Sequence, residues 1–209
     1  LYADVLYLIG NVYNWADDIM NCSLYLRKSK DAARKYGFEA VLMKAYSSLA
    51  ILYTKTEDYG LSLEYFQKTN ELTDKLKDNY IKASSLKSLG NLYNILGQLD
   101  DALKILNEAL ILATEYKQYT TILLCHQFIT NNYEKRGDFE NALKHHKLEV
   151  EIESKLFKEE LKIKTRGLHV KFDLEEAKHD NEIYRLKNID LAEANEKINH
   201  QKVKIQDIN

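Results

Sequence analysis

A repeat of forty residues constrains the fold of this chain more than any other feature of its sequence. Gly10, Ala50, Gly90 and Thr130 stand in register, and a tyrosine follows each of them three residues later. Three further columns keep this register: Ile19, Tyr59, Leu99 and Phe139; Cys22, Ser62, Ala102 and Ala142; and Leu26, Phe66, Leu106 and His146. Four copies without an insertion predict an array in which each unit packs mainly on its neighbours.

Each copy is interpreted as two antiparallel helices joined by a short turn. The chain has no proline and only seven glycines, so few residues in it would end a helix. In the third copy, apolar residues recur at helical spacing from Leu86 to Leu96, and Gly97 follows where a residue with positive φ would end the helix. Aspartates are the expected N-caps of the second helices, at Asp18, Asp58 and Asp138.

The column residues are interpreted as packing parts of these hairpins. Gly90 would allow the two helices to approach closely, Ala102 would do so from the other side, and Tyr93 would fill the space between them. His146 falls in a column that is otherwise large and apolar, so we expect it in the core.

The segments LGNLYNILGQLDDALKILNEAL and YEKRGDFENALKHH resemble the tetratricopeptide repeat family over roughly residues 3 to 160. The resemblance is weaker in the first two copies, where Asp17 and Glu57 replace the turn glycine. The longer period and the missing closing proline imply longer helices than the family's usual ones. The resemblance implies an all-α fold, a right-handed α-solenoid of four forty-residue hairpins at about 3–42, 43–82, 83–122 and 123–160.

The resemblance also implies a concave face that holds a peptide or protein segment. Mapped residue by residue, the family's ligand-facing positions give the candidate site Asn11, Asn14, Lys87, Asn91, Asn94, Gln127 and Asn131. A side-chain amide both donates and accepts, so it can pair with an extended peptide backbone whatever the peptide's sequence. Lys87 and Asn91 resemble half of the family's carboxylate clamp, but Phe128 stands where the clamp would need asparagine. The alternative is that these asparagines are tolerated polar residues on a solvated surface.

The tail, residues 158–209, continues the helical pattern after the four repeats of residues 1–157. We expect Leu161, Leu168 and Phe172 to cap the last repeat, and the remainder to form a coiled-coil-like connecting helix that could make a homodimer. An apolar seam recurs every seven residues at Ile163, Val170, Ala177, Tyr184, Leu191, Ile198 and Ile205. The companion seam is weaker, with Leu174 followed by Asn181, Asn188, Asn195 and Lys202. A plain solvated capping helix is the alternative.

Composition limits the classes of partner and of chemistry. A net charge of -2 argues against a broad surface for nucleic acid or an anionic membrane, and Cys22 and Cys125 fit no disulfide or metal motif. The chain has no apolar run long enough for a membrane span and no signal peptide, so we expect a cytoplasmic protein. We expect no cofactor, no metal and no catalytic residue; adjacent His145 and His146 point to different faces of a helix.

The function expected from these features is a peptide- or protein-binding, non-enzymatic module. EIYRLKNIDLAEANEKI resembles the helix that joins bacterial tetratricopeptide sensor regions to output domains such as diguanylate cyclases and histidine kinases. Because the chain begins with leucine and its last residues still read as charged helix, we expect it to be a piece of a longer protein. Together with the resemblance of the tail, this predicts the regulatory segment of a larger cytosolic bacterial signalling protein. The alternatives are a free-standing adaptor or scaffold, and a regulator of the peptide-pheromone receptor type.

Overall fold

The computed structural model describes the backbone of residues 1–206 and the side chains of residues 1–198. The described backbone forms α-helices and contains no strand. Along that part of the chain, no helix combines the length and the apolar character needed to cross a membrane. The helices are α1 (Tyr2–Trp15), α2 (Ile19–Tyr36), α3 (Glu39–Lys55), α4 (Tyr59–Leu76), α5 (Asn79–Ile95), α6 (Leu99–Glu115), α7 (Tyr119–Lys135) and α8 (Phe139–Gln206).

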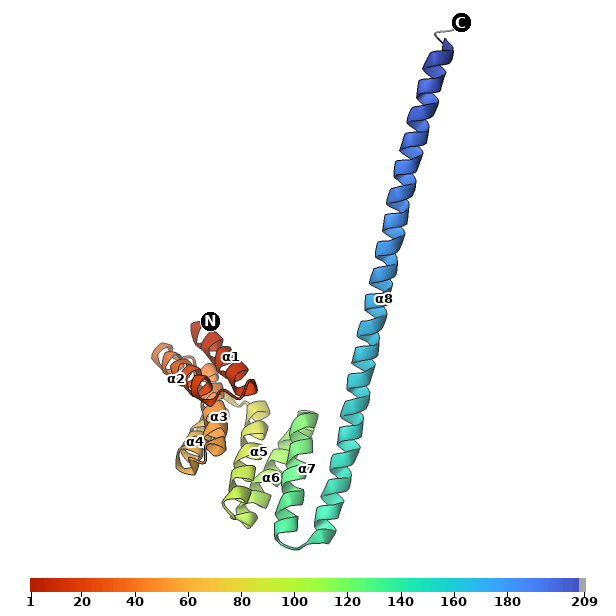
Figure 1. The fold of residues 1–209 in the computed structure, drawn as a ribbon. Helices are drawn as coiled ribbons and strands as arrows, with labels where there is room; N and C mark the ends of the chain where they lie inside the picture. Colours follow the sequence, from red (N-terminus) through yellow and green to blue (C-terminus); the bar gives the residue numbers. More distant parts are fainter. Residues whose placement is uncertain (207–209) are drawn as a thin grey trace. The chain divides into compact units, whose positions relative to one another are not determined.

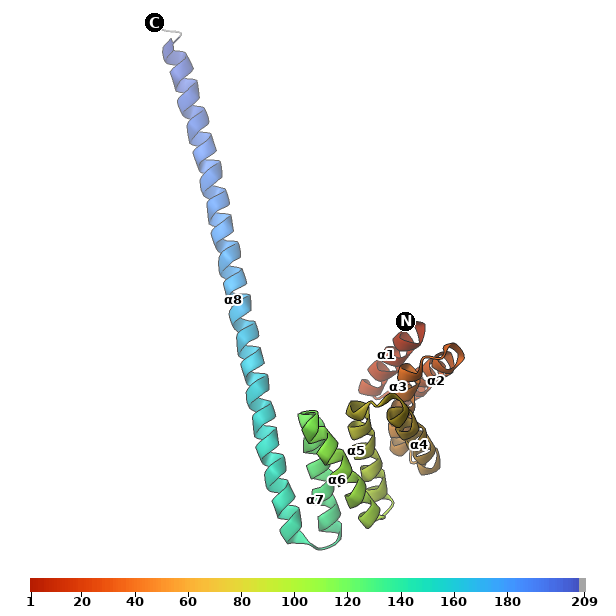
Figure 2. The same ribbon diagram turned by 180° about the vertical axis from the view of Figure 1, so that it is seen from behind.

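The chain divides into two compact units, Leu1–Lys155 and a second unit that begins at Leu156. In the first unit, consecutive helices pair as hairpins, and the second helix of each hairpin packs on the first helix of the next (Figure 1). The view from behind shows the same order of neighbours (Figure 2). The first unit is therefore an α-solenoid of stacked hairpins, which confirms the expected fold class.

The turn inside each hairpin contains one residue with a left-handed backbone. Gly97 and Gly137 have φ of 76° and 74°, and Asp17 and Glu57 adopt φ of 59° and 62° at the equivalent positions. The two acidic residues therefore take the glycine's conformation, although an L side chain costs about 1–2 kcal/mol there. The departures of the first two copies from the family's glycine pattern do not change the geometry of the turn.

The three predicted N-caps are confirmed. Asp18, Asp58 and Asp138 each accept a hydrogen bond from the backbone N–H three residues later. The backbone and side-chain amides of Asn21 hold the pKa of Asp18 below its usual range, and those of Asn141 do the same for Asp138. Asp78 caps α5 in the same way. The alignment of the four repeats did not predict this cap, because Asp78 lies in a turn between two hairpins and the predicted caps belong to turns within hairpins.

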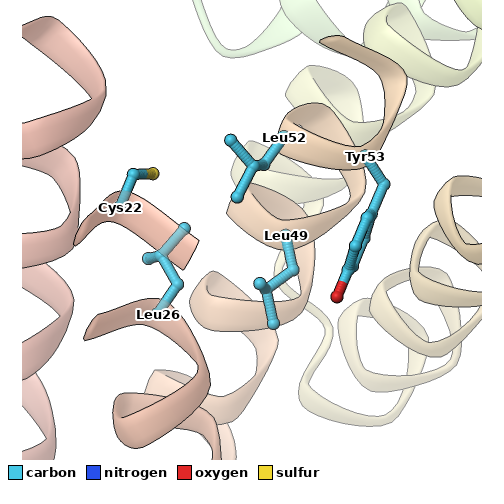
Figure 3. Packing of buried hydrophobic residues seen from close by; sticks show 5 residues of the cluster. All are labelled: Cys22, Leu26, Leu49, Leu52 and Tyr53. Carbon is cyan, nitrogen blue, oxygen red and sulfur yellow. The ribbon is translucent and has the colours of Figure 1, made fainter. Parts of the chain in front are cut away.

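Close helix approach inside the hairpins is visible at the glycine column. A Cβ added to Gly90 would lie 2.6 Å from Cγ of Leu106, and one added to Gly10 would lie 2.9 Å from Cγ of Leu26. Leu26 and Leu106 are fully buried, and the neighbouring core cluster joins α2 to α3 through Cys22, Leu26, Leu49, Leu52 and Tyr53 (Figure 3). Because a side chain would overlap these leucines, Gly10 and Gly90 are positions that need a very small residue.

The tyrosine column packs against a second column that the sequence comparison did not single out. Tyr13 stacks on Tyr25 and Tyr53 on Tyr65, each pair with ring centroids 5.5 Å apart. In the last hairpin the partner of Tyr133 is His145, at 5.8 Å. His145 therefore lies in a packing column.

The expectation that His146 lies in the core is wrong. Its side chain is exposed, and its contact is with Glu149 one turn later on α8. The equivalent residues Leu26 and Phe66 are buried because the first helix of the next hairpin covers them. Within the described residues no further hairpin follows α8, so nothing covers this position.

The second unit consists of the continuation of α8, without a break where the repeats end. Its large apolar side chains are exposed, among them Leu161, Leu168 and Phe172. The capping role and the domain boundary expected at residue 158 stay predictions. Ile205 and Lys202 of the two expected seams lie outside the described side chains.

Candidate functional site

Most of the candidate residues lie on the solvent side of the first helices of the hairpins. Asn11, Lys87, Asn91 and Gln127 are half-buried, whereas Asn14 and Asn131 are exposed. Positions forty residues apart occupy equivalent places in neighbouring hairpins, so Asn91 and Asn131 face the same side of the array.

Asn94 is the exception, and the expectation that it faces a ligand is wrong. Its side chain is 1% exposed. Its amide nitrogen donates to the carbonyl of Phe128 at 2.8 Å, and its amide oxygen accepts from Asn132 at 2.5 Å. Since both ends of the amide already have partners between α5 and α7, Asn94 fixes the stacking of two repeats and is not free to bind a peptide.

The remaining residues of α5 and α7 form one surface, which we call the α5–α7 polar patch: Lys87, Asn91, Gln127 and Asn131. On each helix the two residues are four apart, so they lie one turn apart on one face. The two helices pack directly on each other, as the Asn94 hydrogen bond to Phe128 shows. The patch therefore offers amide groups and one ammonium group side by side.

The other two candidates, Asn11 and Asn14, lie on α1 and are separated from this patch by α3. The α3 residue in the asparagine column is Ile51, whose exposed apolar side chain interrupts the polar row. Asn11 also accepts a hydrogen bond from Ser48 of α3 at 3.5 Å. The seven candidates are thus not one continuous site.

Lys87 is the one titratable residue among the four of the patch. Burial lowers the pKa of its ammonium group, and the one charge interaction that opposes this effect is with the Cys125 thiol. Burial likewise raises the pKa of Cys125 to about 12, so this thiol stays neutral and supplies no counter-charge near pH 7. Among the described residues Lys87 has no carboxylate partner, whereas Lys68 pairs with Glu64 and Lys82 with Asp74.

A surface pocket of about 560 Å³ lies elsewhere, between α4 and α5, and contains none of the predicted residues. Its carboxylates already have partners, because Lys68 pairs with Glu64, Gln67 donates to Glu71, and Lys82 pairs with Asp74. Satisfied polar groups give a ligand little to replace. The pocket is lined by Leu63, Glu64, Gln67, Asn70, Glu71, Asp74, Leu89 and Tyr93.

The histidines form a pair that the sequence did not reveal. Nδ1 of buried His126 on α7 lies 3.0 Å from Nδ1 of His145 on α8. Burial lowers the pKa of both imidazoles, and for His126 the neighbouring His145 lowers it further while Glu149 opposes the shift. Within residues 1–198 no group of three metal-ligating side chains converges.

Comparison with known families supports the repeat assignment in the middle of the array. A tetratricopeptide repeat model matches residues 41–115, which span the second and third hairpins. No curated protein matches the sequence.

Solved structures extend the likeness to most of the chain. Aspartyl phosphate phosphatase F from Bacillus subtilis has a TM-score of 0.68 and 17% identity, covering 74% of this chain and 41% of its own. The apo form of RapI has a TM-score of 0.68 and 18% identity, covering 75% of this chain and 57% of its own. BtubC from P. vanneervenii has a TM-score of 0.64 and 15% identity, covering 74% of this chain and 64% of its own.

At this level of identity the likeness concerns the fold. The fold is that of a tetratricopeptide-like α-solenoid, and the chain spans less than two thirds of each of these three proteins.

Proposed function

We propose that the first unit binds a peptide or protein segment through the α5–α7 polar patch. The observation that carries this proposal is Lys87, a half-buried ammonium group that has no carboxylate partner among the described residues. A ligand carboxylate would supply the missing charge in a partly desolvated place, where ion pairs with hydrogen bonds are strongest.

The three amides of the patch suit the rest of such a ligand. Asn91 and Gln127 are half-buried, and both can donate to and accept from a peptide backbone. Each such hydrogen bond contributes about 1 kcal/mol net, so the patch as a whole, and not one residue, would give useful affinity. The full carboxylate clamp is not proposed, because Phe128 stands in place of its second asparagine.

The test is a panel of extended peptides, each made with a free C-terminal carboxylate and with an amide. Binding is measured by calorimetry for the protein and for Asn91→Ala/Asn131→Ala. Loss of two amide contacts should weaken binding by about 2 kcal/mol, roughly thirty-fold in Kd. Lys87→Met should remove the preference for the carboxylate form.

Matched controls come from the second helix of the same hairpin. Asn107 and Lys104 are exposed on α6, so Asn107→Ala and Lys104→Met should leave binding unchanged. The asparagine variants and the two controls should keep the unfolding curve of the parent protein, because these side chains lie at the surface, and no variant should be less stable than the parent by more than about 0.5 kcal/mol. Equal binding by the patch variants and by the controls would reject the patch as the site.

We further propose that the tail forms a homodimer. Its seven-residue seam is exposed at every described position from Ile163 to Ile198. An apolar stripe of this period is buried when two helices supercoil around each other, and the asparagines of the companion seam would fix the register.

Sedimentation tests the dimer. The intact chain should sediment as a dimer, and removal of residues 178–209 should give a monomer. Leu191→Lys should dissociate the dimer, whereas Glu193→Lys, a charge change off the seam, should not. The same monomeric mass for the intact and the shortened chain would end the proposal.

The biological role that we propose is that of a regulatory sensor segment in a larger cytosolic signalling protein. Ligand binding at the patch would act through the tail on a following output domain, provided that the ligand binds two states of the dimer unequally. A coding sequence with a cyclase or kinase domain after Asn209 supports this role. A stop codon within a few residues favours the adaptor or scaffold, and a DNA-binding domain before Leu1 favours the receptor-type regulator.

A further inference from the structure

An apolar stripe on α1 is uncovered, although two of its positions are buried in every other hairpin. Leu1, Val5, Leu8, Val12 and Trp15 follow a spacing of four and three residues, so they lie on one face of the helix. All five are exposed, Val5 by 44%, Val12 by 57% and Trp15 by 85%. We call these five residues the α1 stripe.

Two of these positions, those of Val5 and Val12, are buried in all the later hairpins, whereas the equivalents of Leu8 are half-buried and those of Trp15 are exposed. The equivalents of Val5 are Ala45, Ser85 and Cys125, each 0% exposed, and those of Val12 are Leu52, Leu92 and Asn132, at most 3% exposed. At these two positions repeat one has valine twice, whereas repeat three has Ser85 and repeat four has Asn132. At these two positions the uncovered repeat one is as apolar as the covered repeat two, and more apolar than repeats three and four.

The preceding hairpin is what covers these positions. Leu52 of α3 packs with Cys22 and Leu26 of α2, and Leu92 of α5 packs with Phe66 of α4. Cys125 of α7 packs with Ala109 of α6.

The polar side chains at these positions also contact the preceding hairpin. Ser85 donates to Asn70 of α4 at 3.1 Å, and Asn132 donates to the carbonyl of Leu99 of α6 at 2.8 Å. Even the position of Trp15 has equivalents that reach back, because Lys55 pairs with Asp17 and Lys135 donates to the carbonyl of Asn94. Three successive interfaces thus use the positions of Val5 and Val12 in one way.

We propose that the α1 stripe is the stacking surface for one more helical hairpin, which precedes Leu1 in the same polypeptide. The second helix of that hairpin would lie where α2, α4 and α6 lie on α3, α5 and α7. Its sequence should place a small residue one period before Cys22 and a large apolar residue one period before Leu26. The array would then continue on the N-terminal side by the same interface that joins its other members.

Charge and size favour this occupant over a solvated surface. The stripe carries no charged side chain, and it offers two valines, two leucines and a tryptophan. A continuous apolar helix face of this kind is buried in stable repeat arrays, and terminal repeats normally end in a polar outer face. The inference does not depend on the peptide-binding patch, which lies on α5 and α7.

Amide hydrogen exchange on α1 tests the proposal. The chain beginning at Leu1 is compared with the natural polypeptide that includes the residues before it. Covering the stripe should slow exchange in α1 by about tenfold or more, while α5 changes little. Val12→Lys should abolish this gain, whereas Met20→Lys, the same charge placed on the exposed side of α2, should keep it.

Both variants alter exposed side chains, so each should retain the parent helicity, checked by circular dichroism. Unchanged exchange in α1 after extension, or a preceding sequence without a helical hairpin, would overturn the proposal. Self-association of the Leu1 chain that Val12→Lys abolishes would also overturn it, because a second copy would then be the occupant.

Discussion

The substitution Gly90→Ala tests the packing inside the hairpins most directly. The added Cβ would lie 2.6 Å from Cγ and 2.7 Å from Cδ2 of Leu106, and 3.4 Å from the carbonyl oxygen of Ala102. Carbon atoms in ordinary contact are about 3.5–4.0 Å apart, so the helices or Leu106 must move by about 1 Å.

Two opposing effects set the change in the free energy of unfolding that Gly90→Ala causes. Overpacking of a dense core costs about 1–3 kcal/mol, and Leu106 has no free space because it is fully buried. Replacing glycine by alanine inside a helix returns about 1 kcal/mol. We therefore expect the free energy of unfolding to fall by up to about 2 kcal/mol, measured by urea unfolding followed by far-UV circular dichroism.

Gly60→Ala is the matched control in the same unit. Its Cβ would meet only the Asp58 carboxylate, at 4.0 Å, so the stability should stay the same or rise slightly. In a Leu106→Ala background the penalty of Gly90→Ala should shrink, because both clashing atoms, Cγ and Cδ2 of the leucine, are then absent. If Gly90→Ala is as stable as Gly60→Ala, close helix approach does not explain the glycine column.

Further predictions concern the buried polar groups. Asn94→Ala should lower the free energy of unfolding by about 1–3 kcal/mol, because it leaves the Phe128 carbonyl without its donor. In the same urea titration, Asn91→Ala at the surface should change the free energy of unfolding by less than about 0.5 kcal/mol. Stability should decline as the pH falls below about 6.5, because burial depresses the pKa of His126 and His145 in the folded state and the unfolded chain then binds more protons. The double variant His126→Leu/His145→Tyr, which copies the residues found at these positions in other hairpins (Leu86 and Tyr65), should flatten that dependence in urea midpoints compared between about pH 7.5 and 5. Lys87→Met should raise stability slightly in the absence of ligand, because it removes a desolvated charge without a carboxylate partner.

The sequence by itself determined the hairpins and their turns. A fixed period of forty residues gives the number and order of the hairpins, and Asp18, Asp58 and Asp138 mark where second helices begin. These features are local, since a cap or a turn needs only residues within a few positions of each other. The need for a small residue at Gly90 could also be predicted, because the column repeats.

Only the tertiary structure decided which equivalent positions are covered. Asn91 and Asn94 look alike in sequence, yet one is half-buried at the surface and the other is held between α5 and α7. His146 shares a column with Leu106 but is exposed, and Val12 shares one with Leu92 but is uncovered. In a stacked array a residue is buried by the neighbouring hairpin, so the ends of the array break the equivalence that the sequence repeat implies.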